Sequence, residues 1–293
     1  MKDNDYIIVS DATVDLDRSI LEQLNVRIIP MIYVLDGKEN FCNPLEQDID
    51  HDGFYEKVNA GIPVSTSQNP PTIFTDFYEK IAKEYKNILY LCFSSGLSGN
   101  YGSAVIGAGE YMEEHPGIRI EVVDSLCASV GEGYLLREVC RKRDEGASFE
   151  ELLRYTEEIK RQVCHWFVVG NLDQLARGGR INPALAKLGS ILNIHPILTT
   201  DDAGKLKVSE KVRGMKKALL KLCERFENNA FPGDGHRIMV AHAASPELAE
   251  ELKNLLLATG RVSDCIIQKI GPVIGSHTGS PMCAVVFMGR QEE

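Results

Sequence analysis

The chain has 293 residues, of which 44% are hydrophobic and 25% charged, a composition typical of globular proteins at a length where two domains are expected. The formal net charge of −10 and the lack of a long basic run argue against binding to nucleic acid or another polyanion. No apolar stretch is long enough to span a membrane, and a predicted strand that starts at Tyr6 leaves no room for a signal peptide.

The first half of the chain alternates predicted strands and helices. Strands are predicted at residues 6–9, 28–34, 88–93 and 118–123, and helices at about 71–84 and from about 98. We expect the second strand to lie at an edge because Pro30 cannot donate a hydrogen bond to a neighbouring strand. Asp36 and Gly37 predict a turn after it. This alternation predicts a mostly parallel sheet with helices on both faces.

A second α/β domain is predicted from about residue 156. Residues 148–151 have a capping-box pattern that starts a helix, and the strand predicted at 165–169 is the first strand of the second domain. Ser245 and Pro246 predict the start of a later helix. We place the boundary between about 145 and 165, which gives domains 1–155 and 156–293, the second with a mixed or antiparallel sheet. Its other strands are predicted at 205–208, 237–241, 265–268 and 284–287.

The common signatures of catalysis do not occur. The sequence has no phosphate loop, no G-x-S-x-G nucleophile elbow and no H-E-x-x-H zinc helix, and residues 131–133 lack the third glycine of a dinucleotide fingerprint. The seven histidines are dispersed, so a metal site is not expected. The eight cysteines form no C-x-x-C pair and predict reduced, mostly buried thiols in the cytoplasm.

Two clusters of hydroxyl side chains stand at predicted helix starts. Residues 94–99 (SSGLSG) follow a buried strand, where open α/β sheets collect ligands, and residues 65–68 (STSQ) precede a proline-rich helix start. Free N–H groups at such positions favour an anion, although the hydroxyls could equally cap the helices. Gly99, Gly102 and Gly107 then form a small-residue stripe, which indicates close approach of a sheet, a helix or a slender ligand.

Three later segments combine glycine with a cation or histidine. Residues 177–181 place Arg177 and Arg180 around two glycines, and residues 211–214 place Lys211 and Arg213 just before a helix. His277 lies in what we predict to be a glycine-rich loop, at residues 275–279. Each cation is expected either to meet a partner or anion or to form an internal salt bridge. The histidine is expected either to bind an anion or to be structural.

The order and content of these segments resemble the DegV family over nearly the whole chain. Two positions depart from the family pattern, because His195 stands where a lysine is frequent and residues 279–281 (GSP) replace a Gly-Pro-Gly run. The second departure affects the expected shape of the segment around His277. The matching segments are residues 10–16, 66–68, 94–99, 124–125, 177–181, 192–198, 211–214 and 274–279.

The resemblance implies a bacterial lipid-binding protein that is not itself an enzyme. Such proteins hold a long-chain fatty acid and, in many bacteria, present its carboxyl group to a separate ATP-binding kinase subunit, which makes an acyl phosphate. The residues that match the carboxyl-binding positions are Thr66 and Ser98. Other implied sites are the supporting ligand contacts Ser67, Ser95 and His277 and the partner or phosphoryl contacts Arg180 and Arg213.

The resemblance also implies a narrow apolar tunnel, which we expect in the N-terminal half, and no cofactor or metal. Burying about fourteen methylenes at roughly 0.8 kcal/mol each gives on the order of 11 kcal/mol before ordering costs. The carboxyl group still needs hydrogen bonds, which threonine and serine hydroxyls can supply. A water-poor site would also protect an acyl phosphate from hydrolysis.

Two other functions remain open at this point. A serine hydrolase would use Ser95 or Ser98 with His277, and would need the two side chains within hydrogen-bonding distance and an acid that orients the histidine. A sugar-phosphate-binding or regulatory module on a related fold, as in the dihydroxyacetone kinase family, would have a short, polar pocket.

Overall fold

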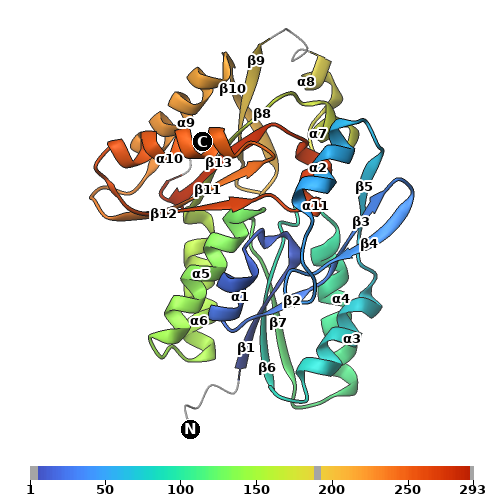
Figure 1. The fold of residues 1–293 in the computed structure, drawn as a ribbon. Helices are drawn as coiled ribbons and strands as arrows, with labels where there is room; N and C mark the ends of the chain where they lie inside the picture. Colours follow the sequence, from blue (N-terminus) through green and yellow to red (C-terminus); the bar gives the residue numbers. More distant parts are fainter. Residues whose placement is uncertain (1–5, 188–192, 291–293) are drawn as a thin grey trace.

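The computed structural model describes residues 6–187 and 193–290. It is a layered α/β structure with two main sheets (Figure 1). The layers run in the order α3 and α4, first sheet, α5 and α6, second sheet, α9 and α10. Leu192, the first residue of one matching segment, lies outside the described residues.

The first sheet is parallel, as its alternating strands and helices predict. Its strand order is β2-β1-β6-β7. Both faces are covered by helices, which explains why β6 is almost entirely buried. The strands are β1 (Tyr6–Asp11), β2 (Arg27–Ile29), β6 (Asn87–Cys92) and β7 (Arg119–Asp124). The covering helices are α3 (Pro71–Ile81) and α4 (Asn100–Glu114) on one face, and α5 (Val130–Asp144) and α6 (Phe149–Ile159) on the other.

The single strand predicted at 28–34 is wrong, because the chain changes sheets at Pro30. β2 ends at Ile29 on the edge of the first sheet, and β3 (Met31–Leu35) starts in a separate antiparallel sheet of order β4-β3-β5. Proline has no N–H to donate to a neighbouring strand, so the hydrogen bonding of the first sheet stops at this position. Asp36 and Gly37 make the predicted turn with φ of 53° and 71°. The partners of β3 are β4 (Lys38–Cys42) and β5 (Val64–Ser67).

The second sheet is mixed, as expected for the C-terminal half. Its order is β10-β9-β8-β13-β11-β12, and only the β11–β12 pair is parallel among these neighbours. The helices α9 (Met215–Asn229) and α10 (Pro246–Ala258) cover one face, and α5 packs against the other. The strands are β8 (Val163–Val169), β9 (Ile194–Thr200), β10 (Leu206–Arg213), β11 (His236–Ala243), β12 (Val262–Lys269) and β13 (Met282–Met288).

The layer of α5 and α6 is shared by both sheets. Its buried residues belong to one apolar cluster with strands of the first sheet and with β8, β11 and β13 of the second. Gly131 lets α5 come this close, because a Cβ there would lie 1.7 Å from Nε2 of His165 in β8. Ser148 and Glu151 form the predicted capping box at the start of α6. The two halves of the chain therefore pack on a common core.

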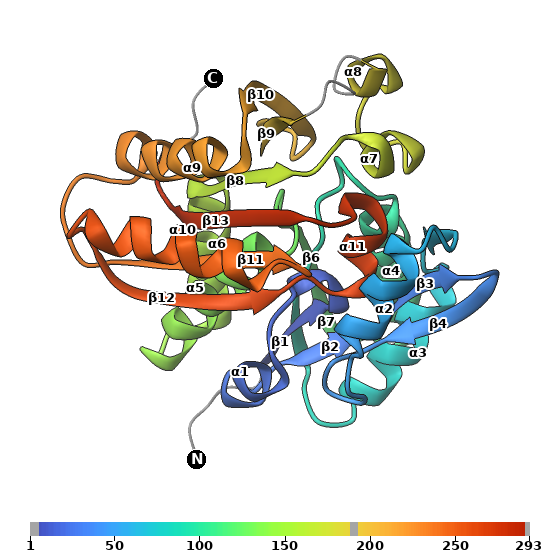
Figure 2. The same ribbon diagram turned by 45° about the horizontal axis from the view of Figure 1, so that its top comes forward.

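The remaining helices are short, and three of them, α2, α7 and α11, lie together where the two halves meet (Figure 2). The most central is α11 (Pro272–Thr278), which packs against α2, α7, β3 and β5. The others are α1 (Arg18–Gln23), α2 (His51–Asn59), α7 (Asp173–Arg177) and α8 (Pro183–Lys187), with the 3₁₀ turns η1 (Ala12–Val14) and η2 (Lys160–Gln162). In the part of the chain that the structure describes, no helix is long and apolar enough to cross a bilayer.

Candidate functional site

A largely apolar cavity lies between the two halves of the chain. The N-terminal half contributes Phe93 and Leu97, and the C-terminal half contributes Phe167, Leu206 and Val286, among other residues. The expectation that the tunnel lies in the N-terminal half is therefore only partly right. The reason is that β8, β9 and β13 present their apolar side chains towards the first half, so that both halves form the wall.

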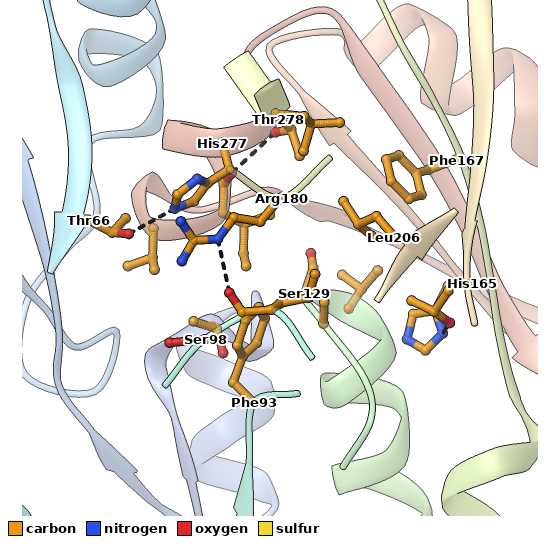
Figure 3. A pocket seen from close by; sticks show the side chains of 18 of the residues that line it. Thr66, Phe93, Ser98, Ser129, His165, Phe167, Arg180, Leu206, His277 and Thr278 are labelled. Carbon is orange, nitrogen blue, oxygen red and sulfur yellow. Dashed lines mark hydrogen bonds between the residues drawn. The ribbon is translucent and has the colours of Figure 1, made fainter. Parts of the chain in front are cut away.

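Thr66 and His277 meet at one end of this cavity. Thr66 stands on β5, and its Oγ1 lies 2.8 Å from Nε2 of His277 (Figure 3). The predicted glycine-rich loop around His277 is wrong, because this residue lies in the last turn of α11. Pro272 starts that helix, and Gly275 is needed within it because a Cβ would come 2.4 Å from the hydroxyl of Tyr55.

The imidazole of His277 is neutral at physiological pH. Burial, together with the nearby charge of Arg180, lowers its pKa to about 4. Its Nδ1 atom is buried and has no hydrogen-bond partner among the described residues. We assign the proton to Nε2, since Nε2–H can then donate to Thr66 while the Nδ1 lone pair faces a cationic neighbourhood. The hydroxyl hydrogen of Thr66 is then left for a ligand.

Ser98 supplies a second hydroxyl to the same cavity. It lies just before α4, where its Oγ accepts a hydrogen bond from the backbone N–H of Asn100 at 3.2 Å. The hydroxyl thus supports the helix start and still has its own hydrogen to donate. Ser98 can therefore support the helix start and contact an anion at the same time, so the two roles expected for residues 94–99 do not exclude each other. Ser67, on β5 beside Thr66, also lines the cavity.

Arg180 brings a cation to the same end of the cavity. Its guanidinium lies between His277 and Ser98 (Figure 3). Nε donates to the carbonyl of Leu97 at 2.9 Å, and a second nitrogen donates to the carbonyl of Gly178. The side chain is half-buried and makes no ion pair with a described carboxylate, and burial lowers its pKa. Arg180 is therefore a desolvated cation whose charge is not balanced by the protein residues described.

The two glycines before Arg180 allow this arrangement. A Cβ on Gly178 would lie 2.3 Å from Nδ1 of His277, so only glycine lets this loop pass over the imidazole. Gly179 has a φ of 74°, in the left-handed region that favours glycine. These glycines therefore have a role within the protein, which is to let the backbone pack against His277.

Two predicted site residues lie outside this cavity. Ser95 is exposed and does not line it, and its backbone N–H donates to Asp124 at 3.1 Å. Arg213 is exposed at the end of β10 and forms no ion pair with any described residue.

A β-bulge near Ser209 decides which way the cations of β10 point. The register shifts between Val208 and Glu210, so that Val208 pairs with Leu198 and Lys211 pairs with Pro196. Leu198 and Pro196 are two residues apart and share one face of β9. The bulge therefore turns Lys211, and Arg213 with it, to the sheet face that also lines the cavity.

The sequence did not reveal the other end of the cavity. His165 and Thr200, on β8 and β9, line it, and burial lowers the pKa of His165 to about 4. A buried strand shows no pattern that identifies which of its side chains face a cavity. The stripe predicted on α4 divides between different roles. Gly107 allows close packing of α3, since a Cβ there would lie 2.7 Å from the carbonyl of Pro71, whereas Gly99 lines the cavity and Gly102 has no neighbour within 4 Å of such a Cβ.

The arrangement can bind an anion but lacks parts of a hydrolytic triad. The hydrogen bond of His277 goes to a threonine, and no described acid contacts its Nδ1. Within residues 6–187 and 193–290, no group of three potential metal ligands comes together. What the site offers is two hydroxyl donors, one half-buried guanidinium and a largely apolar chamber behind them.

Comparisons with known proteins agree with this picture. The model of the DegV family matches residues 6–290. A DegV domain-containing protein from Clostridium perfringens is 36% identical over 288 residues, which cover 98% of this chain and 99% of that protein.

Solved structures extend the likeness to the fold. A DegV family protein from Thermus thermophilus, described for its fatty acid binding, has a TM-score of 0.86 at 30% identity and covers 97% of this chain and 99% of its own. The Fatty Acid Kinase (Fak) B3 protein of Streptococcus pneumoniae, loaded with linoleic acid, has a TM-score of 0.84 at 20% identity, with coverage of 97% and 99%. At that identity the second comparison concerns the fold alone.

Proposed function

Because this chain belongs to the DegV family, we propose that it binds a long-chain fatty acid and presents the carboxyl group to a separate kinase subunit. That subunit would use ATP to convert the carboxyl group to an acyl phosphate. The observation that carries the proposal is a largely apolar cavity with Thr66, Ser98 and the cation Arg180 grouped at one end. A fatty acid has the same arrangement, with an apolar chain and one charged end.

The head group would accept hydrogen bonds from Thr66 and Ser98. The Thr66 hydroxyl accepts a hydrogen bond from Nε2 of His277 and the Ser98 hydroxyl accepts one from the backbone N–H of Asn100, so each keeps its own hydrogen for the ligand. A carboxylate must be hydrogen-bonded when it is taken out of water. Ser67 is a further candidate donor from the same wall. Ser95 is a less direct candidate, because it lies outside the cavity lining.

Arg180 would meet the charge that phosphorylation adds. It already lies at the head-group end, is half-buried, and has no described carboxylate to neutralise it. A guanidinium is suited to phosphate oxygens because it offers several donors in one plane. Arg180 is thus proposed as the phosphoryl contact. Its neighbour His277 stays neutral and acts through Thr66.

Arg213 is proposed as a docking residue for the kinase subunit. It is exposed, and the bulge in β10 turns it to the sheet face that carries the cavity. The alternative was an internal salt bridge, but Arg213 forms none with any described residue. An exposed cation steers an acidic partner and raises the rate of association more than it adds to affinity.

We propose that the chain is a carrier and not a catalyst. The hydrolase alternative is disfavoured, since His277 pairs with Thr66 and not with a serine, and no described acid orients it. A sugar-phosphate module is disfavoured by the largely apolar wall behind the head-group end. The eight cysteines form no disulfide, which supports a cytoplasmic location.

Organic extraction of the purified protein, followed by mass spectrometry, tests the proposal. A stoichiometric long-chain fatty acid is the expected result. If no lipid is found and none binds on addition, the proposal is wrong. Turnover of an ester without bound lipid would favour the hydrolase, and neither lipid nor turnover would favour the regulatory module.

A further inference from the structure

Asp15 is a buried carboxylate at the junction of the two halves. It follows η1 and has a φ of 48°, in the left-handed region that is uncommon for a residue with a side chain. Burial raises its pKa to about 7. A carboxyl group in such a place needs well-formed hydrogen bonds to remain there.

Each oxygen of Asp15 accepts a hydrogen bond from a different half of the molecule. Oδ2 accepts from the hydroxyl of Ser129, which stands before α5 and lines the cavity, at 2.5 Å. Oδ1 accepts from the backbone N–H of Gly271 at 2.8 Å. Gly271 directly precedes α11, and a Cβ there would lie 2.7 Å from Oδ1 of Asp15. The carboxylate thus fastens the N-cap residue of α11 to the N-terminal half.

The other end of α11 carries the head-group site. His277 lies six residues after Gly271, and its Nε2 contacts Thr66, which belongs to the N-terminal half. The helix has two turns at most, so a movement at its first residue is transmitted to its last turn. Asp15 and Thr66 therefore hold opposite ends of one short helix.

We propose that Asp15 is a positioning residue that fixes α11 against the N-terminal half and so holds His277 in place to orient the Thr66 hydroxyl. The inference deepens the proposed function and rests on it where ligand affinity is concerned. Asp15 does not line the cavity, so it acts on the ligand only through α11 and Ser129.

Two substitutions, Asp15→Gly and Asp15→Asn, separate the loss of the Asp15 hydrogen bonds from other consequences of replacing this residue. Glycine removes both acceptors and tolerates the left-handed backbone, where alanine would be strained. Asparagine also tolerates this backbone, and it can accept from Gly271 and donate to Ser129. Asp17→Ala is the matched control, because Asp17 accepts from Gln268 across the same junction at 3.1 Å without touching α11.

Two measurements on the ligand-free protein test the role of Asp15 directly. In Asp15→Gly, amide hydrogen exchange in α11 should become at least about tenfold faster, corresponding to roughly 1.4 kcal/mol of lost local protection. The Nε2 proton of His277, which burial and its bond to Thr66 should make visible in the NMR spectrum of the unmodified protein, should disappear in this variant. Asp15→Asn should restore both signals nearly to those of the unmodified protein, and Asp17→Ala should leave them unchanged.

Fatty-acid affinity is the third readout. With palmitate as the probe, Asp15→Gly should raise Kd about tenfold, and Asp15→Asn should keep it within about threefold. The proposal is overturned if folded Asp15→Gly keeps normal exchange in α11, or if Asp17→Ala loosens α11 equally. If the unmodified protein binds no fatty acid, the proposed function fails, while the exchange and NMR results still decide the role of Asp15.

Discussion

Removing the two head-group hydroxyls gives the most direct test of the site. In a Thr66→Ala/Ser98→Ala variant the apolar wall stays intact, because neither substitution reaches the residues behind the head-group end. The fatty acid should therefore still bind through its chain, with the carboxyl group short of two donors. The measured effect is expected in Kd and not as a complete loss of binding.

The magnitude follows from the hydrogen bonds. Each hydroxyl donates to a carboxylate, and each such bond contributes about 1–1.5 kcal/mol at a partly solvated position. The sum of about 2–3 kcal/mol corresponds to a roughly 30- to 150-fold increase in Kd. Thr66→Ala also leaves Nε2 of His277 without its partner, which should lower the free energy of unfolding by about 1–3 kcal/mol.

Competition against a fluorescent fatty acid measures the change in Kd, and circular dichroism confirms that the variant is folded. Thr75→Ala/Ser263→Ala is a suitable control, because these hydroxyls bond to backbone carbonyls away from the cavity. Its affinity should match that of the unmodified protein. Unchanged affinity in the folded Thr66→Ala/Ser98→Ala variant would show that the head group binds elsewhere.

Other expected outcomes concern catalysis, docking and pH. The isolated protein should neither hydrolyse ATP nor phosphorylate a fatty acid, and activity in a preparation free of kinase would contradict this. Arg213→Ala should leave fatty-acid Kd and Tm nearly unchanged and lower the phosphorylation rate with the kinase subunit; a lower Tm with an unchanged rate would instead indicate a structural role. Arg180→Ala should lower that rate further and also reduce Tm, because its bonds to two carbonyls are lost. Between pH 7 and 5 the unfolded chain protonates His277 near its usual pKa of 6.5, whereas the folded chain, with a pKa of about 4, does not. Stability should therefore fall by about 2 kcal/mol from this residue as the pH drops, and His277→Gln should lose about that much less in urea titrations.

The fold could be predicted where the sequence pattern is local. The buried run that became β6 and the capping box at Ser148 both identified their elements directly. The edge position expected from Pro30 holds for β2 but not for β3, which is the middle strand of its own sheet, because local pattern could not show that the chain would enter another sheet there. Which sheet a strand joins depends on contacts with residues far away in sequence.

The site could be predicted only in part for the same reason. Thr66 and Ser98 stand at helix or strand ends with recognisable motifs, and the structure places both at one cavity. His277 was expected in a loop because glycines surround it, yet Gly275 belongs to a helix that packs so close to Tyr55 that a side chain would not fit. The partnership of Asp15 with Gly271 spans 256 residues. No spacing rule in the sequence could have indicated it.

The position of β13 bears on how the protein acquires its cavity during synthesis. This strand is the last along the chain, yet it is inserted between β8 and β11 and contributes Met282, Ala284 and Val286 to the cavity wall. Until residues 282–288 have been made, β8 and β11 lack the strand that pairs with both of them. The cavity wall is therefore completed only after these residues have left the ribosome, and we expect the proposed ligand to be retained only by a chain that includes them.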